Sequence, residues 1–191
     1  MNNNLIRESA NGFNTVSVEA TLLSERKMFL TEEVSRESCR ILLQQLIFFK
    51  EEDPDAEVVL YINCPGGSVY DGLAVYDVMR MMNVRTVCIG TAGSMGSIFF
   101  LAGNEREMLP HSRVMIHDPS LNGGSYAGQK PHQLQHVVDD LTKTRDLLCE
   151  IIKERSGKPL EKIKELTKED TFFTAKEALE FGLATKIIES F

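Results

Sequence analysis

Apolar residues along the chain follow two patterns, short continuous runs and runs with helical spacing. Continuous runs of this kind are typical of strands covered on both faces. A looser alternation of Val16, Val18, Ala20 and Leu22 also predicts a strand. The strands expected from these patterns cover residues 15–23, 57–63, 84–90 and 113–117. Helical spacing and capping signals predict helices over residues 34–50, 70–82, 131–155 and 175–181, and a further short helix is expected directly after the turn at Ser94.

Strands and helices therefore alternate through most of the chain, which predicts an α/β fold. In such sheets reactive groups gather beyond the carboxyl ends of the strands. Gly67, Ser94 and His117 all fall at such ends in this sequence. We expect these three residues to meet at one edge of the sheet.

Ser94 lies in the small-residue stretch Ala-Gly-Ser-Met-Gly-Ser, residues 92–97. A strand that enters a glycine turn and leaves as a helix exposes one side chain at the corner. A hydroxyl there would lie at a helix N-terminus, where free N–H groups favour the oxyanion of acyl transfer. Serine is also a preferred helix N-cap, so a purely structural role competes with a nucleophilic one.

Composition narrows the function classes. The chain has 191 residues and a formal net charge of −7, which argues against nucleic acid or an anionic membrane as a partner. The first residues lack the basic and apolar segments of a secretory signal, and no apolar run is long enough to span a bilayer. The widely spaced Cys39, Cys64, Cys88 and Cys149 predict buried thiols in a reducing cytoplasm.

The four histidines differ in context. His111 lies in a turn, and His132 and His136 are four residues apart on the long expected helix, without a third metal ligand. We therefore predict no metal site. His117 ends a buried strand and is the candidate base for Ser94, since a serine hydroxyl needs a base that an acid orients. Spacing alone leaves four candidates for that acid: Asp118, Asp139, Asp140 and Asp170.

Four ordered segments are distinctive: Tyr-Ile-Asn-Cys-Pro-Gly-Gly at 61–67, Gly-Ser-Met-Gly at 93–96, Arg-Val-Met-Ile-His-Asp-Pro at 113–119 and Asp-Thr-Phe-Phe-Thr-Ala at 170–175. With these the chain resembles the ClpP-type peptidases, the proteolytic subunits of ATP-dependent Clp proteases, from about residue 16 to residue 188. The resemblance implies a serine endopeptidase in which Ser94 is the nucleophile, His117 the base and Asp170 the orienting acid. Backbone N–H groups of Gly67 and Met95 would form the oxyanion hole.

The same resemblance implies further sites. An extended substrate would pair with a strand containing Gly123, Gly124 and Ser125. An AAA+ unfoldase would dock on apolar residues that include Phe48, Tyr61 and Ile188. Each of these three residues could equally belong to the core by sequence alone.

The implied fold is the ClpP/crotonase-like fold, with repeated β-β-α units and a protruding long helix called the handle. We expect a single peptidase domain over 1–191, with a mobile axial segment at 1–14 and a handle region at ~118–156. Two seven-membered rings would stack into a tetradecamer that works with an unfoldase such as ClpX, ClpA or ClpC. ATP would be used by that partner, so no cofactor is expected in this chain.

The sequence departs from the family pattern at several positions. Glu169 stands where the family has an arginine that links the rings, and Gly93 replaces an alanine beside the nucleophile. One alternative is therefore a divergent paralogue that acts as an assembly or regulatory subunit with a second ClpP ring. Another is thioester chemistry of the enoyl-CoA hydratase kind, against which the full serine, histidine and aspartate set argues.

Overall fold

The computed structural model describes residues 4–9, 12–121 and 128–190. Its strands are β1 (Asn4–Ser9), β2 (Gly12–Ser17), β3 (Lys27–Leu30), β4 (Val58–Cys64), β5 (Val84–Gly93), β6 (Glu105–Met108), β7 (Arg113–Ile116), β8 (Thr171–Thr174) and β9 (Lys186–Ile187). Its helices are α1 (Val18–Ser24), α2 (Arg36–Glu52), α3 (Val69–Arg80), α4 (Met95–Ala102), α5 (Pro131–Ser156), α6 (Leu160–Thr167) and α7 (Ala175–Phe181). This alternation confirms the predicted α/β fold.

The main sheet has the strand order β3-β4-β5-β6-β9, and its neighbours run parallel. The long strand β5 pairs with β6 through residues 85–88 and then with β7 through residues 91–93. Strand β8 pairs antiparallel with β7. The final residues of β5 therefore lie beside β7, and β7 lies beside β8, which matters for the site.

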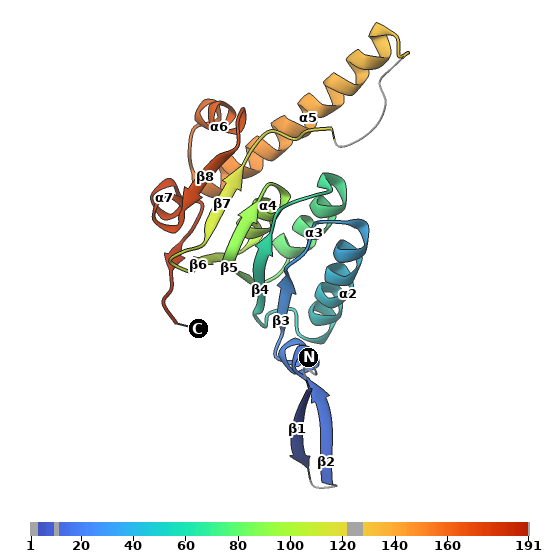
Figure 1. Cartoon of the computed structure of the whole chain (residues 1–191), viewed down its shortest axis with the longest axis vertical. Coiled ribbons are helices and arrows are strands. Elements are labelled where there is room, and N and C mark those ends of the chain that lie inside the picture. The colour runs from blue at the N-terminus through green and yellow to red at the C-terminus, as the bar shows by residue number, and fades with distance from the viewer. Residues whose placement is uncertain (1–3, 10–11, 122–127, 191) are drawn as a thin grey trace.

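The core lies between this sheet and the helices that pack on one side of it, among them α2, α3 and α4 (Figure 1). Helix α4 is apolar all round, and all eight of its residues are buried. A helix with this composition has no solvent face and must lie inside the molecule. Because α4 follows Ser94 directly, the corner at Ser94 is fixed by the core itself.

Two parts project from this body (Figure 1). The hairpin of β1 and β2 extends at one end, and the amino-terminal half of α5 extends at the other. Between Pro131 and Lys143 no residue of α5 is buried, whereas Leu148, Cys149 and Ile152 are. Helix α5 matches the handle helix expected over 131–155 in position and length.

The strand expected at 15–23 is wrong beyond Ser17, where the chain turns into helix α1. The Ser17 hydroxyl accepts a hydrogen bond from the Ala20 N–H at 3.0 Å and caps the helix. Alternating apolar residues thus misled the assignment, because a capping serine in their midst starts a helix. The hairpin itself was not predicted, and it includes residues of the segment 1–14 that we expected to be a mobile axial segment.

Other boundaries moved by a few residues. Helix α2 begins at Arg36 rather than at 34, because Ser35 and Ser38 form a capping box. Val34 instead forms an isolated parallel bridge with Gly67. Helix α4 begins at Met95, directly after Ser94, which confirms the short helix expected after that turn. The short strands β3, β6, β8 and β9 were not predicted, since two to four residues carry little periodic signal.

Candidate active site

Ser94 occupies a strained corner between β5 and α4. Its backbone has φ +50° and ψ −122°, a region that residues with a side chain rarely adopt. The corner is held on one side by the Ser94 N–H, which donates to the Met115 carbonyl at 2.9 Å. Its hydroxyl caps no helix N–H, so the structural reading of Ser94 as an N-cap has no hydrogen bond to support it.

Glycines make room for this corner. A Cβ on Gly66 would lie 2.5 Å from the Ser94 Cβ, and one on Gly93 would lie 2.8 Å from the Pro65 carbonyl oxygen. Below them, the Gly66 N–H donates to the Cys64 sulfur at 3.4 Å. The loop at the end of β4 and the turn at the end of β5 therefore pack backbone against backbone.

The register of β5 and β7 brings His117 to Ser94. Gly93 pairs with Met115, so the next residues beyond these strands rise together at the sheet edge. The His117 Nε2 lies 2.8 Å from the Ser94 Oγ, within hydrogen-bond distance. The His117 side chain is 25% exposed, which leaves this pair accessible to a substrate.

The register of β7 and β8 selects one carboxylate among the four candidates. Ile116 pairs with Thr171, so Asp170 lies opposite His117 one step beyond the strands. An Asp170 carboxylate oxygen is 3.2 Å from the His117 Nδ1. Of the other candidates, Asp139 and Asp140 accept hydrogen bonds from Gln135 and Tyr70, respectively. The third, Asp118, has a buried Oδ1 without a described hydrogen-bond partner.

Two backbone N–H groups beside this corner, those of Gly67 and Met95, have no hydrogen-bond acceptor within their own bridge or helix. In the bridge with Val34, the Val34 N–H donates to the Gly66 carbonyl and the Ser68 N–H donates to the Val34 carbonyl. This alternation turns the N–H of the intervening Gly67 to the opposite side, as in any parallel ladder. Met95 is the first residue of α4, so its N–H has no acceptor within the helix.

A cavity of about 310 Å³ opens at this corner. It is lined by Glu33, Pro65, Gly66, Gly67, Val69, Ser94, Met115, His117, Pro119 and Ser120. A second cavity of about 750 Å³ shares five of these residues and continues to α5. Together they form a groove from Ser94 to the handle. The predicted substrate strand with Gly123, Gly124 and Ser125 lies outside the described residues.

The residues predicted to dock an unfoldase have different exposures. Phe48 is 60% exposed on α2 and lines a cavity of about 500 Å³ with Leu23 of α1. Tyr61 is half-buried and stacks on Phe29, with ring centroids 4.9 Å apart. Ile188 is only 6% exposed and packs with Val59 and Val87. The structure therefore places Ile188 beneath the surface and Phe48 on it.

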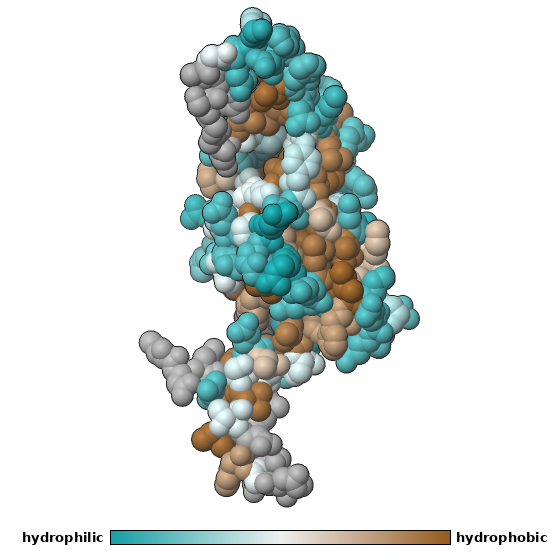
Figure 2. Space-filling model, turned by 90° about the vertical axis from the view of Figure 1, so that its right-hand side faces the viewer, coloured by the Kyte–Doolittle hydropathy of each residue, from teal (hydrophilic) through white to brown (hydrophobic). Residues whose placement is uncertain are grey.

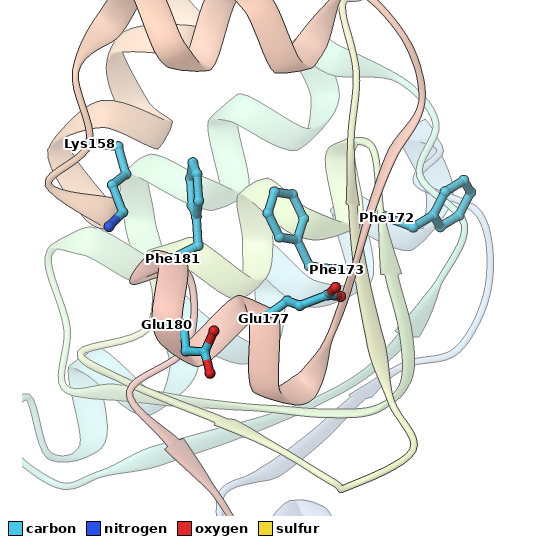
Figure 3. Close-up of a pocket in the computed structure, with 6 residues that line it drawn as sticks. All are labelled: Lys158, Phe172, Phe173, Glu177, Glu180 and Phe181. Atoms are coloured by element: carbon cyan, nitrogen blue, oxygen red, sulfur yellow. The ribbon is translucent and has the colours of Figure 1, made fainter.

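A further cavity of about 300 Å³ lies between β8 and α7 (Figure 3). Phe173 points into it toward Phe181, and the two ring centroids are 5.0 Å apart. Phe172 points to the other side of the strand and is 53% exposed. The Lys158 ammonium lies 5.4 Å from the Phe181 ring centroid, so this aromatic surface already has its own cation. This packing fixes β8, and with it the Asp170 end of the strand.

All four cysteines are free and buried, as predicted from their apolar surroundings. Burial raises the pKa of each thiol, that of Cys39 to about 11. Within the described part of the chain, no cluster of three or more histidine, cysteine, aspartate or glutamate side chains is arranged to hold a metal. In the same residues no helix is both long and apolar enough to cross a membrane.

Comparison with known proteins adds the following. The family model described as Clp protease matches residues 10–191. The ATP-dependent Clp protease proteolytic subunit 1 of Synechococcus sp. (strain CC9902) is 40% identical over 97% of this chain and 94% of its own length. Subunit 2 of Parasynechococcus marenigrum (strain WH8102) is 38% identical over the same shares of both chains. Subunit 1 of Prochlorococcus marinus (strain NATL2A) is 38% identical over 96% of this chain and 93% of its own.

Proposed function

The chain belongs to the Clp protease family, and we propose that it is a proteolytic subunit whose nucleophile is Ser94. The observation that carries this proposal is the row of three side chains in which the His117 Nε2 is 2.8 Å from the Ser94 hydroxyl and the His117 Nδ1 is 3.2 Å from the Asp170 carboxylate. Three residues that are far apart in the sequence form this row only because of the registers of β5, β7 and β8.

In the proposed reaction the Ser94 Oγ attacks the carbonyl carbon of a peptide bond. The His117 Nε2, at 2.8 Å, takes the hydroxyl proton and later gives it to the leaving amine. The Asp170 carboxylate, 3.2 Å from the His117 Nδ1, is proposed to accept a hydrogen bond from the Nδ1–H, which would leave Nε2 as the basic nitrogen and stabilise the imidazolium that forms. Water then hydrolyses the acyl-enzyme by the same steps.

The tetrahedral intermediate carries a negative charge on the former carbonyl oxygen. The N–H groups of Gly67 and Met95 are proposed to donate to this oxyanion, since neither has a partner within its own bridge or helix. The N-terminus of α4 adds a favourable dipole at the same point. Only glycine fits at position 67, because its φ is +144° and a Cβ there would lie 2.2 Å from the Val34 carbonyl oxygen. The close approach of Gly67 to Val34 that the bridge requires therefore depends on this glycine.

The family's assemblies suggest the partners. We propose that the exposed half of α5 contacts a second copy, so that two seven-membered rings stack into a tetradecamer. An AAA+ unfoldase would dock near Phe48 and deliver unfolded polypeptides, using ATP itself. The alternative of an assembly-only paralogue rests on Glu169 and on the unusual amino-terminal residues, and the close approach of Ser94, His117 and Asp170 favours the peptidase instead.

Labelling with a fluorophosphonate probe tests the proposal. The Ser94 Oγ would form a bond to phosphorus as fluoride leaves, with His117 taking the proton. We expect the wild-type chain to be labelled, Ser94→Ala to be unlabelled and His117→Ala to be labelled at least ~100-fold more slowly, as expected for loss of a general base. The measurement is probe fluorescence on the intact protein, with the modified peptide found by mass spectrometry.

Ser120→Ala provides a matched control, since Ser120 lines the same cavity but is not part of the row of Ser94, His117 and Asp170. This variant should be labelled at the wild-type rate. Labelling that persists in Ser94→Ala, or that is lost with Ser120 instead, would reject Ser94 as the nucleophile.

A further inference from the structure

The cavity at Ser94 contains a carboxylate that the proposed reaction does not use. Glu33 comes from the segment between β3 and α2 and lines both cavities of the groove. Its side chain packs directly over Gly67: a Cβ on Gly67 would lie 2.9 Å from the Glu33 Cγ. Glu33 is therefore next to a proposed oxyanion donor and on the wall that a bound peptide must pass.

The backbone of Glu33 is held from both sides. The Ser38 hydroxyl donates to the Glu33 carbonyl at 3.0 Å. The following residue, Val34, is 1% exposed and forms the bridge with Gly67, with two hydrogen bonds of 2.7 Å. The position of the Glu33 side chain is thus set by the same contacts that position Gly67.

Few other charged or titratable groups face this groove. Among the described residues, His117 is the other charged or titratable group of the cavity at Ser94, and the larger cavity adds the Tyr70 phenol of α3 and His136 and Asp140 of α5. Asp140 already accepts a hydrogen bond from the Tyr70 hydroxyl at 3.3 Å. The carboxylate of Glu33 forms no ion pair with any described lysine, arginine or histidine. A negative charge without a cation therefore lies on the substrate path.

We propose that Glu33 is a specificity-determining residue that favours peptides with a lysine or arginine side chain close to the scissile bond. The proposal rests on the proposed peptidase function of Ser94. An extended peptide rises about 3.3 Å per residue, so a side chain one or two residues from the reacting carbonyl can reach a carboxylate on the cavity wall. Acidic side chains at those positions would be repelled.

Fluorogenic tripeptide amides test this preference. Lysine, norleucine or glutamate occupies each of the three positions before the scissile bond in turn, and kcat/KM is measured for each substrate. At the position that faces Glu33 we expect lysine to exceed glutamate about tenfold, the sum of one attraction and one repulsion in a partly exposed site. Norleucine should fall between them, and 0.5 M NaCl should reduce the difference because it screens exposed charges.

Glu33→Gln should reduce that difference to within about twofold, while hydrolysis of the norleucine peptide continues. Glu32→Gln is the matched control, because Glu32 is the neighbouring exposed carboxylate, changes the net charge equally and lines neither cavity. This control should keep the wild-type preference. An equal lysine-to-glutamate ratio in the wild type, or a ratio that Glu33→Gln leaves unchanged, overturns the proposal.

A binding measurement separates this outcome from failure of the peptidase function. The lysine and glutamate peptides, labelled with a fluorophore and without a cleavable amide dye, are titrated with Ser94→Ala and with Ser94→Ala/Glu33→Gln, and anisotropy is followed. If the lysine peptide binds more tightly than the glutamate peptide to Ser94→Ala but not to Ser94→Ala/Glu33→Gln, the role of Glu33 is supported, even if the wild type hydrolyses nothing. Equal binding to both proteins contradicts that role, even if Ser94-dependent hydrolysis is found.

Discussion

Around Ser94 the apolar residues of the chain are buried within the chain itself, whereas apolar residues in the first half of α5 are exposed. All eight residues of α4 are buried, but Leu134 and Val138 on α5 are 37% and 54% exposed. Figure 2 shows brown, apolar patches on the upper, projecting part of the molecule as well as on the body below it. The two regions therefore differ: side chains of this chain alone form the row at Ser94, whereas the apolar side chains of α5 stay exposed, and we propose that a second copy covers them.

This difference explains where the chain can store strain. Unfavourable backbone angles persist only where the surroundings over-determine them. Ser94 has such angles between a buried strand and a buried helix, with its N–H held by the Met115 carbonyl. An open helix such as the first half of α5 has no such surroundings, and its backbone is regular up to the left-handed cap at Gly157.

The largest expected effect comes from replacing Ser94 with glycine or with alanine. Both variants lose the nucleophile, and we expect peptide hydrolysis to fall by at least ~1,000-fold in each. Glycine adopts φ +50° without strain, which recovers about 1–3 kcal/mol, less about 0.4–1 kcal/mol for its freer unfolded state. Ser94→Gly should therefore be more stable than Ser94→Ala by about 1 kcal/mol.

Thermal unfolding of the two variants at equal protein concentration measures this difference. Alanine is the control, since it removes the same hydroxyl and its hydrogen bond to His117 but keeps a Cβ at the strained corner. Equal stabilities, or a less stable glycine variant, would mean that the corner at Ser94 stores no strain that its surroundings must hold.

The sequence predicted the contents of the site better than its arrangement. Ser94 and His117 were expected at one sheet edge, because each follows an apolar run long enough to recognise as a strand. The choice of Asp170 over Asp118, Asp139 and Asp140 depends on the pairing of β7 with β8, which has only four residues. Strand pairing between distant segments leaves no local pattern, so only the family resemblance pointed to Asp170.

The same limit applies to Glu33. Nothing in its neighbourhood signals that Val34 forms a bridge with Gly67, and the helical spacing even placed Val34 inside a helix. The bridge becomes visible only when the loop after β4 and the segment before α2 are seen together. Local patterns thus predict elements, and functional neighbours come from the contacts between them.

A charged substitution on α5 tests the proposal that a second copy covers the exposed apolar residues of this helix. Val138→Asp puts a carboxylate on the exposed apolar stripe, where assembly would bury it, and burial of an unpaired charge is costly. We expect the proposed double ring to dissociate, with self-association weakened at least ~100-fold. The free energy of unfolding of the single chain should change by less than about 0.5 kcal/mol, because position 138 is exposed in the unassembled chain. Sedimentation velocity and urea unfolding measure the two effects.

Lys143→Gln serves as the matched control for this variant. It changes the net charge by the same −1, is also exposed, and lies five residues further, about 140° around the helix at 100° per residue. This variant should assemble as the wild type does. If both variants assemble normally, the open half of α5 is not completed by a second copy.

The last prediction concerns the body of the chain, through the buried thiol of Cys39 in α2. Burial raises its pKa from 9 to about 11, so between these values the folded chain holds a proton that the unfolded chain has released. This contribution to stability is complete below pH 9 and is lost as the pH rises to 11, by about 2–3 kcal/mol at 1.36 kcal/mol per unit.

Cys39→Ala has no thiol to titrate, so its free energy of unfolding should fall less steeply over this range. Urea unfolding at pH 8, 9, 10 and 11, with both chains carrying Val138→Asp to exclude assembly, gives the difference in slope. The other thiols and tyrosines titrate in both chains and cancel in that difference. Parallel slopes would mean that water reaches Cys39 in the folded state. The core around α2 would then be less well shielded from water than its contrast with the exposed half of α5 implies.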